Sequence, residues 1–240
     1  MSEAAYDAIA EWYDSIVRSG GLIHDIVLPR VNALIGNPQG QTICDLACGQ
    51  GIVSRHLARQ GAQIVGVDLS GKLLEIARSY LDDDPLAISY IRGDAQALAL
   101  RNGTFDGVVC NMALMDIPDL RAVLLNVARI LKQQGWFVFS ITHPCLETIR
   151  AQTRWVHDEI GEQAVNSYFV EGLWRSDNLD GIRGKVGAYH RTLTTYINTL
   201  WDAGLAVEQL IEPQAVEDMA VRYPAYRDTP TTLVARCRKR

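Results

Sequence analysis

The stretch ICDLACGQGIVSRHL, residues 43–57, holds a glycine-bearing turn. A short apolar run leads into the turn and an amphipathic run leaves it, which is the strand, turn and helix arrangement that binds nucleotide-like ligands. Gly49 and Gly51 suit such a turn, because glycine lets a ligand approach the backbone closely and accepts positive backbone dihedral angles. The stretch predicts a ligand site, and the neighbouring polar residues indicate which ligand it takes.

Polar side chains stand where four expected strands end. Asp45 lies at the end of the first, Asp68 at the end of the second, and Asp94 and Asn111 at the ends of the third and fourth. The carboxyl ends of parallel strands share one edge of a sheet, so these side chains should converge on one crevice. A carboxylate in the position of Asp68 can accept both hydroxyls of a ribose, which predicts a ribose-bearing ligand.

The glycine pattern differs from the dinucleotide-binding pattern GxGxxG. Ser54 stands where the third glycine would be, and Asp45 puts a carboxylate just before the loop. That carboxylate would repel a pyrophosphate and attract an ammonium group. The loop therefore favours a ligand with an amino-acid end, and it disfavours a nicotinamide-dependent oxidoreductase.

Strand and helix patterns alternate through most of the chain after residue 40. Strands are expected over residues 42–47, 63–69, 87–93, 105–111, 135–142, 205–212 and 231–238, with helices beginning near residues 52, 71 and 120 and one over 191–203. Apolar residues at helical spacing predict two helices within residues 1–40. This order predicts an α/β fold: an open, mostly parallel seven-stranded sheet with helices on both faces.

The alternation of strand and helix patterns stops after the fifth expected strand. Residues 145–190 are polar, aromatic and glycine-bearing, and we expect them to form a lid insertion. Within them, residues 168–174 and 183–190 are expected to pair as an antiparallel hairpin. We expect a single domain over residues 1–240, with residues 1–40 as its helical cap.

Composition argues against several classes of protein. The net charge of −5 disfavours a nucleic-acid surface, and no apolar run approaches the roughly 20 residues that cross a bilayer. The N-terminus is acidic where a signal peptide would be basic, so we expect a cytoplasmic protein without a membrane partner. The five cysteines are scattered, which predicts neither a disulfide framework nor a metal site. The oligomeric state stays open.

Four segments carry a resemblance to a known family. DLACGQG resembles the first motif of class I S-adenosylmethionine-dependent methyltransferases, and VGVDLS, GDA and FDGVVCNMALMDIPD are similar to the second, third and fourth motifs, in the right order. The resemblance covers about residues 1–143 and the last two strands. It implies S-adenosylmethionine as cofactor and S-adenosylhomocysteine as product. It implies cofactor contacts by Tyr6, Asp45, Ala47, Gly49, Gly51, Asp68, Leu69, Asp94, Ala95, Asn111 and Met112.

The resemblance also implies a role for each polar residue in the crevice. Asp45 would lie near the ammonium group of the cofactor, Asp68 would hold the ribose hydroxyls, and Asp94 would meet the adenine amino group. Asn111 and Met112 would border the methionine chain and the reacting methyl. The chemistry left to the protein is alignment of the acceptor, exclusion of water and removal of a proton where the acceptor needs it.

Three residues are candidates for catalysis. His143 follows the fifth strand, and an imidazole titrates near working pH; the alternative is a histidine that bonds the backbone at a strand end. His190 is the second candidate, and its alternative is a cap or surface position of the following helix. Tyr13, with Tyr6, resembles the N-terminal lid motif of small-molecule members of the family, and core packing is its alternative.

Residues of the expected lid are candidates for acceptor binding. Trp174 and Tyr189 could line an acceptor pocket with Tyr13 and with Trp155, and Arg191 could bind an acceptor carboxylate or phosphate, although isolated arginines more often form surface ion pairs. The leading hypothesis is a methyltransferase acting on an oxygen or nitrogen of a small metabolite. A protein or peptide methyltransferase and a non-catalytic cofactor-binding module are the alternatives. The identity of the acceptor stays open.

Overall fold

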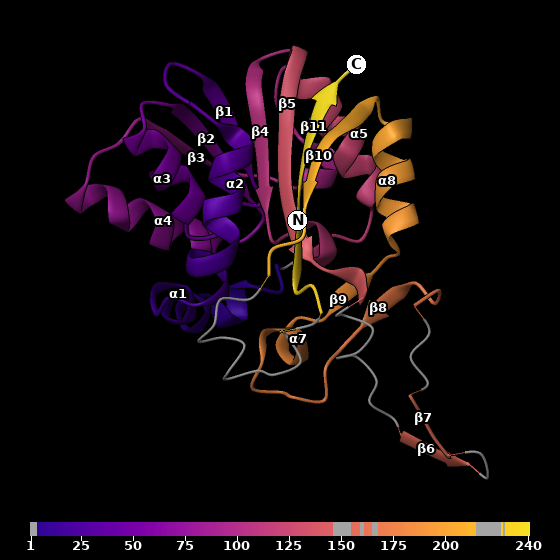
Figure 1. Ribbon diagram of the computed structural model, residues 1–240. Helices are drawn as coiled ribbons and strands as arrows, with labels where there is room; N and C mark the ends of the chain where they lie inside the picture. The colour runs from indigo at the N-terminus through magenta and orange to yellow at the C-terminus, as the bar shows by residue number, and fades with distance from the viewer. Residues whose placement is uncertain (1–3, 146–154, 159–160, 165–167, 215–226, 228) are drawn as a thin grey trace.

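A central sheet organises the protein, seen in a computed structural model that describes residues 4–145, 155–158, 161–164, 168–214, 227 and 229–240. The sheet has seven strands in the order β10-β11-β5-β4-β1-β2-β3 (Figure 1). Only β11 runs antiparallel to its neighbours in this sheet. The predicted open, mostly parallel sheet is therefore confirmed. The strands are β1 (Thr42–Leu46), β2 (Gln63–Asp68), β3 (Ile88–Arg92), β4 (Phe105–Asn111), β5 (Leu131–Thr142), β10 (Leu205–Ile211) and β11 (Thr232–Lys239).

The order of the strands reverses between β1 and β4. From β1 the chain moves outward through β2 to β3, and then returns to the other side of β1 to form β4 and β5. The loops that follow β1 and β4 consequently leave the sheet in opposite directions and open a crevice at its carboxyl edge. This crevice lies where the sequence places the glycine turn and Asn111.

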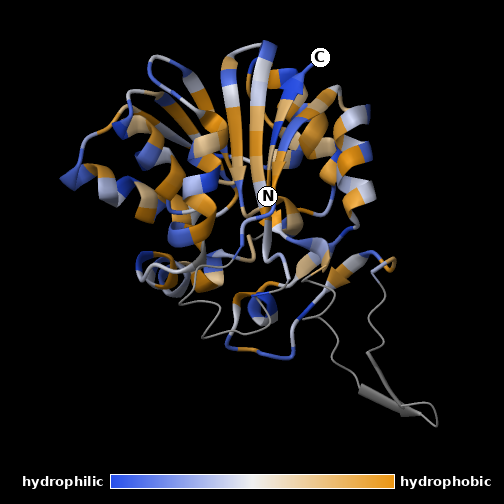
Figure 2. Ribbon diagram, viewed as in Figure 1, coloured by the Kyte–Doolittle hydropathy of each residue, from blue (hydrophilic) through white to orange (hydrophobic). Residues whose placement is uncertain are grey.

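Helices cover both faces of the sheet, as predicted. Helices α2 (Leu28–Ile35) and α3 (Ile52–Arg59) pack on one face, while α5 (Leu120–Ile130) and α8 (Leu193–Asp202) pack on the other. Helix α4 (Gly71–Asp83) packs against β2 and β3. Figure 2 shows hydrophobic residues along the central strands, between the helical layers.

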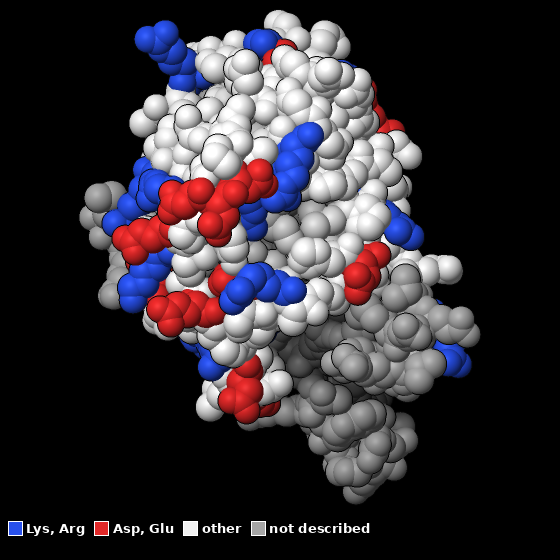
Figure 3. All heavy atoms as spheres, turned by 90° about the vertical axis from the view of Figure 1, so that its left-hand side faces the viewer, with Lys and Arg blue, Asp and Glu red and all other residues white. Residues whose placement is uncertain are grey.

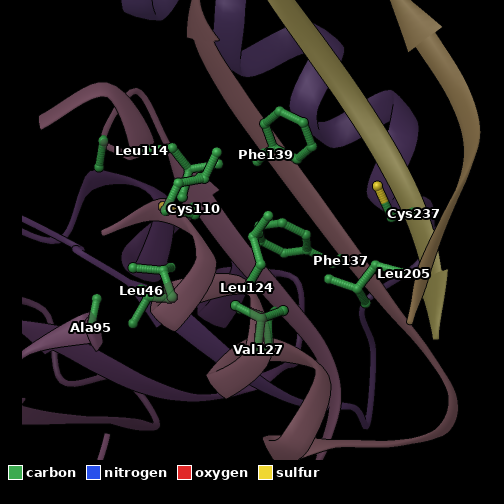
Figure 4. Packing of buried hydrophobic residues seen from close by; sticks show 14 of the residues in the cluster. Leu46, Ala95, Cys110, Leu114, Leu124, Val127, Phe137, Phe139, Leu205 and Cys237 are labelled. Atoms are coloured by element: carbon green, nitrogen blue, oxygen red, sulfur yellow. The ribbon is translucent and has the colours of Figure 1, made fainter. Parts of the chain in front are cut away.

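Successive side chains of each strand point to opposite faces of the sheet, and this alternation divides the core into two clusters. Val108 and Phe137 face α5 and α8, whereas the next residues, Val109 and Val138, face α2 and α3. The rings of Phe137 and Phe139 stack with centroids 5.3 Å apart (Figure 4). Because side chains alternate between the two faces, a parallel sheet covered by helices on both sides needs apolar residues on both faces.

The N-terminal residues are helical, as predicted. They form a short 3-10 turn (Asp7–Ile9), α1 (Ala10–Arg18), a π-helical segment (Leu22–Val27) and α2. Two side chains tie this segment to α4: the Tyr80 hydroxyl donates to Asp14 at 2.8 Å, and the Ser70 hydroxyl donates to Asp7 at 2.5 Å. These bonds hold residues 4–18 over the carboxyl edge of the sheet.

The structure of the insertion differs in part from the predicted hairpin of residues 168–174 and 183–190. Strands β8 (Gly172–Trp174) and β9 (Ala188–His190) pair antiparallel, as expected, but residues 182–185 form a helical turn, α7, and not a strand. The N–H groups of Val186 and Gly187 return to the carbonyls of Ile182 and Arg183 at 2.9 and 3.1 Å, so local helical bonds replace strand pairing there. A second antiparallel pair, β6 (Trp155–Asp158) with β7 (Gly161–Ala164), was not expected.

Two shorter features also differ from the sequence-based expectation. Strand β5 begins at Leu131, four residues before the apolar run, because Leu131 pairs with Phe105 across an irregular step in the register. Turns of 3-10 helix cover Ala95–Ala97 and Leu114–Asp116. In the part of the chain that the structure describes, no helix is both long and apolar enough to cross a membrane.

The packing of α5 predicts different effects for two adjacent leucines. Leu124 is fully buried, whereas Leu125 is 44% exposed. We expect Leu124→Ala to lower the free energy of unfolding by about 2–5 kcal/mol, because it removes buried methyl groups and leaves a cavity. Leu125→Ala should change it by less than about 1 kcal/mol. Urea denaturation followed by circular dichroism measures both, and equal losses would contradict this orientation of α5.

Candidate active site

A cavity lies at the carboxyl edge of the sheet, where the strand order reverses. The N-terminal segment, the loops after β1 to β4 and the end of α7 contribute its walls. Of the residues expected to contact a cofactor, those that line this cavity are Tyr6, Ala47, Gly49, Asp68, Leu69, Asp94, Ala95, Asn111 and Met112. Asp45 and Gly51 do not line it.

Asp68 is held by two backbone donors. Its Oδ2 accepts the N–H of Gly49 at 2.8 Å, and its Oδ1 accepts the N–H of Ser70 at 2.8 Å. Burial raises the pKa of Asp68 above its ordinary value, and the two donors oppose that shift. Since a carboxylate oxygen can accept more than one hydrogen bond, both oxygens retain the capacity to bind a pair of neighbouring hydroxyls.

The two glycines of the turn have different partners. Gly49 has φ +56°, and a Cβ there would meet only a Tyr13 ring carbon, at 3.9 Å, so its backbone is open to the cavity. Gly51 has φ +79° and begins α3, and a Cβ there would overlap the hydroxyl of Tyr90 on β3. The structure thus ties Gly51 to the packing of Tyr90 and not to the cavity.

Asp45 is buried beside the main cavity. It is 1% exposed and lines a smaller adjoining cavity with Gln50 and Asn111. The hydroxyl of Ser54 donates to its Oδ2 at 2.5 Å, and burial raises the pKa of Asp45 to about 7 although this bond opposes the shift. Ser54, which interrupts the dinucleotide pattern, therefore serves as the partner of Asp45.

Asp94 and Asn111 are oriented by neighbouring groups. Asp94 Oδ1 accepts the N–H of Gln96 at 2.8 Å and caps the following 3-10 turn, so this carboxylate both ends the loop and lines the cavity. The hydroxyl of Ser140 on β5 donates to Asn111 Oδ1 at 2.7 Å and accepts the N–H of Met112 at 3.0 Å. Ser140 thereby fixes the end of β4 at the cavity wall.

Tyr6 and Tyr13 both line the cavity. Their rings meet edge to face with centroids 5.2 Å apart, and the Tyr6 hydroxyl donates to Asp116 Oδ2 at 3.0 Å. Arg183 of α7 pairs with Oδ1 of the same aspartate. Burial raises the pKa of both tyrosines well above their ordinary value.

Asp116 is a cavity residue that the sequence analysis did not single out. It lies inside the fourth motif, in NMALMDIPD, but its partners come from distant positions: Tyr6 is 110 residues away and Arg183 is 67 residues away. No local pattern marks such a residue. The signal that the sequence offered was a carboxylate within the fourth motif, shortly after the expected strand that ends at Asn111.

The structure places both candidate histidines outside the cavity lining. His143 is 2% exposed; its Nε2 lies 2.9 Å from a Glu212 carboxylate oxygen, and its Nδ1 accepts the N–H of Cys145 at 3.2 Å. Burial lowers the pKa of His143, while Glu212 opposes the shift. His190 Nε2 lies 2.9 Å from the carbonyl oxygen of Tyr168. Both imidazoles have structural partners at strand ends.

The candidate acceptor residues Trp174, Tyr189 and Arg191 also lie away from the cavity lining. Arg191 is 7% exposed and donates to the carbonyls of Leu114, Ile117 and Pro118 at 3.1, 2.6 and 2.7 Å. Its guanidinium holds the loop after β4 in place. Trp174 packs against the core, Tyr189 lies 5.3 Å from the Arg191 guanidinium, and the Trp155 side chain lies outside the described residues.

Comparisons with known proteins agree with this architecture. A family model described as "Methyltransferase domain" matches residues 44–139. The chain is 34% identical over 119 residues to a ubiquinone biosynthesis O-methyltransferase of Nitrosomonas europaea, and this match covers 49% of the chain and 51% of the relative. The match to the enzyme of the same name in Bordetella avium has 33% identity over 134 residues, 55% of the chain and 56% of the relative. The chain thus spans about half the length of the curated relatives it matches.

Similar solved structures cover most of the chain. An S-adenosylmethionine-dependent methyltransferase from Mesorhizobium loti matches with a TM-score of 0.74 and 29% identity, over 92% of this chain and 99% of that one. A putative S-adenosylmethionine-dependent methyltransferase from Listeria monocytogenes matches with a TM-score of 0.72 and 28% identity, over 88% and 97%. The ordered motifs, the cavity at the strand reversal and these similarities lead to one conclusion: the chain contains a methyltransferase domain over residues 44–139 and has the fold of class I S-adenosylmethionine-dependent methyltransferases.

Proposed function

We propose that this protein transfers a methyl group from S-adenosylmethionine to an oxygen or nitrogen of a small metabolite. The observation that carries the proposal is the charge of the cavity. Asp68, Asp94 and Asp116 line it, whereas no Lys, Arg or His does so among the described residues. Such walls favour a ligand with positively charged sulfur and nitrogen atoms and repel a pyrophosphate.

The residues present fit this cofactor. Asp68 offers two carboxylate oxygens to the ribose hydroxyls, Asp94 faces the adenine end, and Asp45 offers a buried carboxylate to the ammonium group. Gly49 leaves the loop backbone open beside them. When bound, the cofactor supplies a methyl group that its charged sulfur makes electrophilic. The protein then aligns the acceptor and excludes water, and alignment alone is worth up to about 7–11 kcal/mol in well-oriented systems.

Several features favour a small metabolite over a protein acceptor. The N-terminal segment borders the cavity and is tied to α4, and α7 is tied to Asp116 from the other side. Residues of the N-terminal segment and the end of α7 therefore border the site, and a polypeptide acceptor would have to displace them. The relatives named ubiquinone biosynthesis O-methyltransferase also favour an oxygen of a small molecule.

The surface beside α3 and α4 gives no support to a nucleic-acid acceptor. Figure 3 shows basic and acidic side chains interleaved on this face. Arg59, for example, pairs with Asp84 at 2.7 Å. Phosphate backbones are bound by clustered Lys and Arg, and paired charges do not provide such a cluster.

Methyl-labelled S-adenosylmethionine tests the proposal directly. The purified protein is incubated with the labelled cofactor and a fractionated extract of the source cells, and small molecules are then separated from macromolecules. Label in a small-molecule fraction supports the proposal, and its mass and methyl carbon shift assign the acceptor atom. Label only in protein favours a protein methyltransferase, and cofactor binding without transfer favours a non-catalytic module.

The ribose assignment predicts the effect of Asp68→Asn. This change removes the charge that accepts hydrogen bonds from Gly49, Ser70 and the ribose, so the Kd for S-adenosylhomocysteine should rise about 10- to 100-fold. Asp84→Asn, at a carboxylate that is 45% exposed, is the matched control and should leave the Kd unchanged. Isothermal titration calorimetry measures both values. Equal Kd values for Asp68→Asn and the original protein would remove Asp68 from the site.

The buried carboxylate of Asp45 predicts a pH dependence of cofactor binding. Its pKa of about 7 means that the ammonium-binding, charged form is lost as the pH falls through 7. Affinity for S-adenosylhomocysteine should therefore drop by up to about tenfold from pH 8 to pH 6. Asp45→Asn should bind weakly at both pH values. Calorimetric Kd values across this range measure the effect, and an equally steep pH dependence in Asp45→Asn would assign it to another group.

A further inference from the structure

Asp116 lies at a different part of the cavity from Asp68 and Asp94. Asp116 follows β4, whereas Asp68 ends β2 and Asp94 follows β3, and these two strands lie beyond β1 in the sheet. Met112, from the same loop as Asp116, also lines the cavity. Since the resemblance implies that Met112 borders the reacting methyl, we expect Asp116, from the same loop, to lie on the side of the cavity where the methyl acceptor binds.

The surroundings of Asp116 combine polar and apolar groups. Tyr6 donates to one carboxylate oxygen at 3.0 Å and Arg183 pairs with the other, which fixes the orientation of the carboxylate. The Asp116 side chain is 15% exposed and that of Arg183 is 19% exposed. Ile117 and Val186 contribute apolar cavity wall close to them in the chain. A carboxylate oxygen with one donor can still accept a second.

The other ionisable groups of the described lining either are assigned to the cofactor or are unsuited to accept a proton. Asp68 and Asp94 are assigned to the ribose and the adenine, and burial keeps Tyr6 and Tyr13 protonated by raising the pKa of each. Neither His143 nor His190 lines the cavity. Asp116 is the remaining group of this lining that can take a proton from an acceptor.

We propose that Asp116 binds the hydroxyl group of the methyl acceptor and accepts its proton, with Tyr6 and Arg183 as positioning residues. The acceptor oxygen forms a bond to the methyl carbon as its proton passes to the carboxylate, and the electrons of the broken carbon–sulfur bond stay on sulfur. Charge is balanced, because a sulfonium becomes a thioether and a carboxylate becomes a carboxylic acid. The inference rests on the proposed methyl transfer.

The same geometry defines the class of acceptor. An anionic acceptor meets no Lys, Arg or His in the described lining, and Arg183 is already paired with Asp116. An ammonium group gains little from Asp116, because Arg183 already balances its charge. Apolar walls with one hydrogen-bond acceptor match an uncharged hydroxyl compound with an apolar body, such as a phenol.

The environment of Asp116 also sets the sign of a pH effect. The titratable and charged groups that act on it or are influenced by it are Tyr6, Tyr13, Cys110 and Arg183. Burial raises the pKa of Asp116, while Arg183 and Tyr6 oppose the shift. Removing Arg183 should therefore raise this pKa further, so that the charged form is lost at a higher pH.

Binding of simple aromatic probes tests the proposal without turnover. The protein is saturated with S-adenosylhomocysteine and titrated in a calorimeter with catechol, with the anion 3,4-dihydroxybenzoate and with the cation dopamine. Catechol should bind at least about tenfold more tightly than either charged probe, and Asp116→Asn should weaken catechol binding by about tenfold or more. Asp116→Asn should keep the Kd for S-adenosylhomocysteine within about threefold, and Asp84→Asn should change neither value.

Arg183→Gln separates a role in binding from a role in structure, since it breaks the ion pair but keeps the carboxylate. Arg183→Gln should retain catechol binding at high pH. As the pH falls, it should lose this binding at a higher pH than the original protein does. A purely structural ion pair would instead give equal losses in Arg183→Gln and Asp116→Asn with no shift along the pH axis, which overturns the proposal. Absent catechol binding, stronger binding of a charged probe, or unchanged binding in Asp116→Asn also overturns it.

The design keeps the two proposals distinguishable. If the original protein fails to bind S-adenosylhomocysteine, the proposed function itself fails. If it binds S-adenosylhomocysteine but the catechol results are contrary, the cofactor assignment stands and only the role of Asp116 is lost.

Discussion

The site depends on the hydrogen bonds that Asp68 accepts from the backbone of Gly49 and Ser70. They join the loop after β1 to the start of α4 across the end of β2. Ser70 extends the connection, because its hydroxyl also accepts the N–H of Leu73 and donates to Asp7 of the N-terminal segment. A buried carboxylate is costly without such donors, so the charge that would hold a ribose also fixes the loops around it.

A second set of contacts joins the N-terminal helix to the same loop. Tyr80 of α4 donates to Asp14 of α1, and the guanidinium of Arg55 lies 4.1 Å from the centre of the Tyr80 ring. Arg55 in turn donates to the carbonyl of Gln50, within the glycine turn. The segment that covers the cavity and the turn that forms its floor are therefore parts of one connected network. This connection explains why helices that precede the sheet belong structurally to the site.

The sequence predicted the sheet and the strand ends well, because these features are encoded by residues that are neighbours in the chain. Apolar runs bounded by turn residues mark β1 to β5; Asp68 and Asn111 are the last residues of β2 and β4, and Asp94 lies just beyond the end of β3. Features decided by distant contacts were not predictable in this way. The pairing of Arg183 with Asp116, the contact of His143 with Glu212 and the fit of Tyr90 over Gly51 each join residues far apart in the chain or in different elements. At Gly51 both the positive φ of +79° and the close approach of Tyr90 exclude a side chain, and the second of these could not be read from the sequence.

The acidic lining of the cavity has a consequence for the end of the catalytic cycle. In the proposed reaction, the cofactor enters with a charged sulfur and leaves with a neutral one, so its net positive charge decreases by one unit. The attraction exerted by Asp68 and Asp94 on the cofactor therefore weakens after methyl transfer. The same walls therefore hold the product by a weaker electrostatic attraction than the reactant, which assists exchange of the spent cofactor for a fresh one.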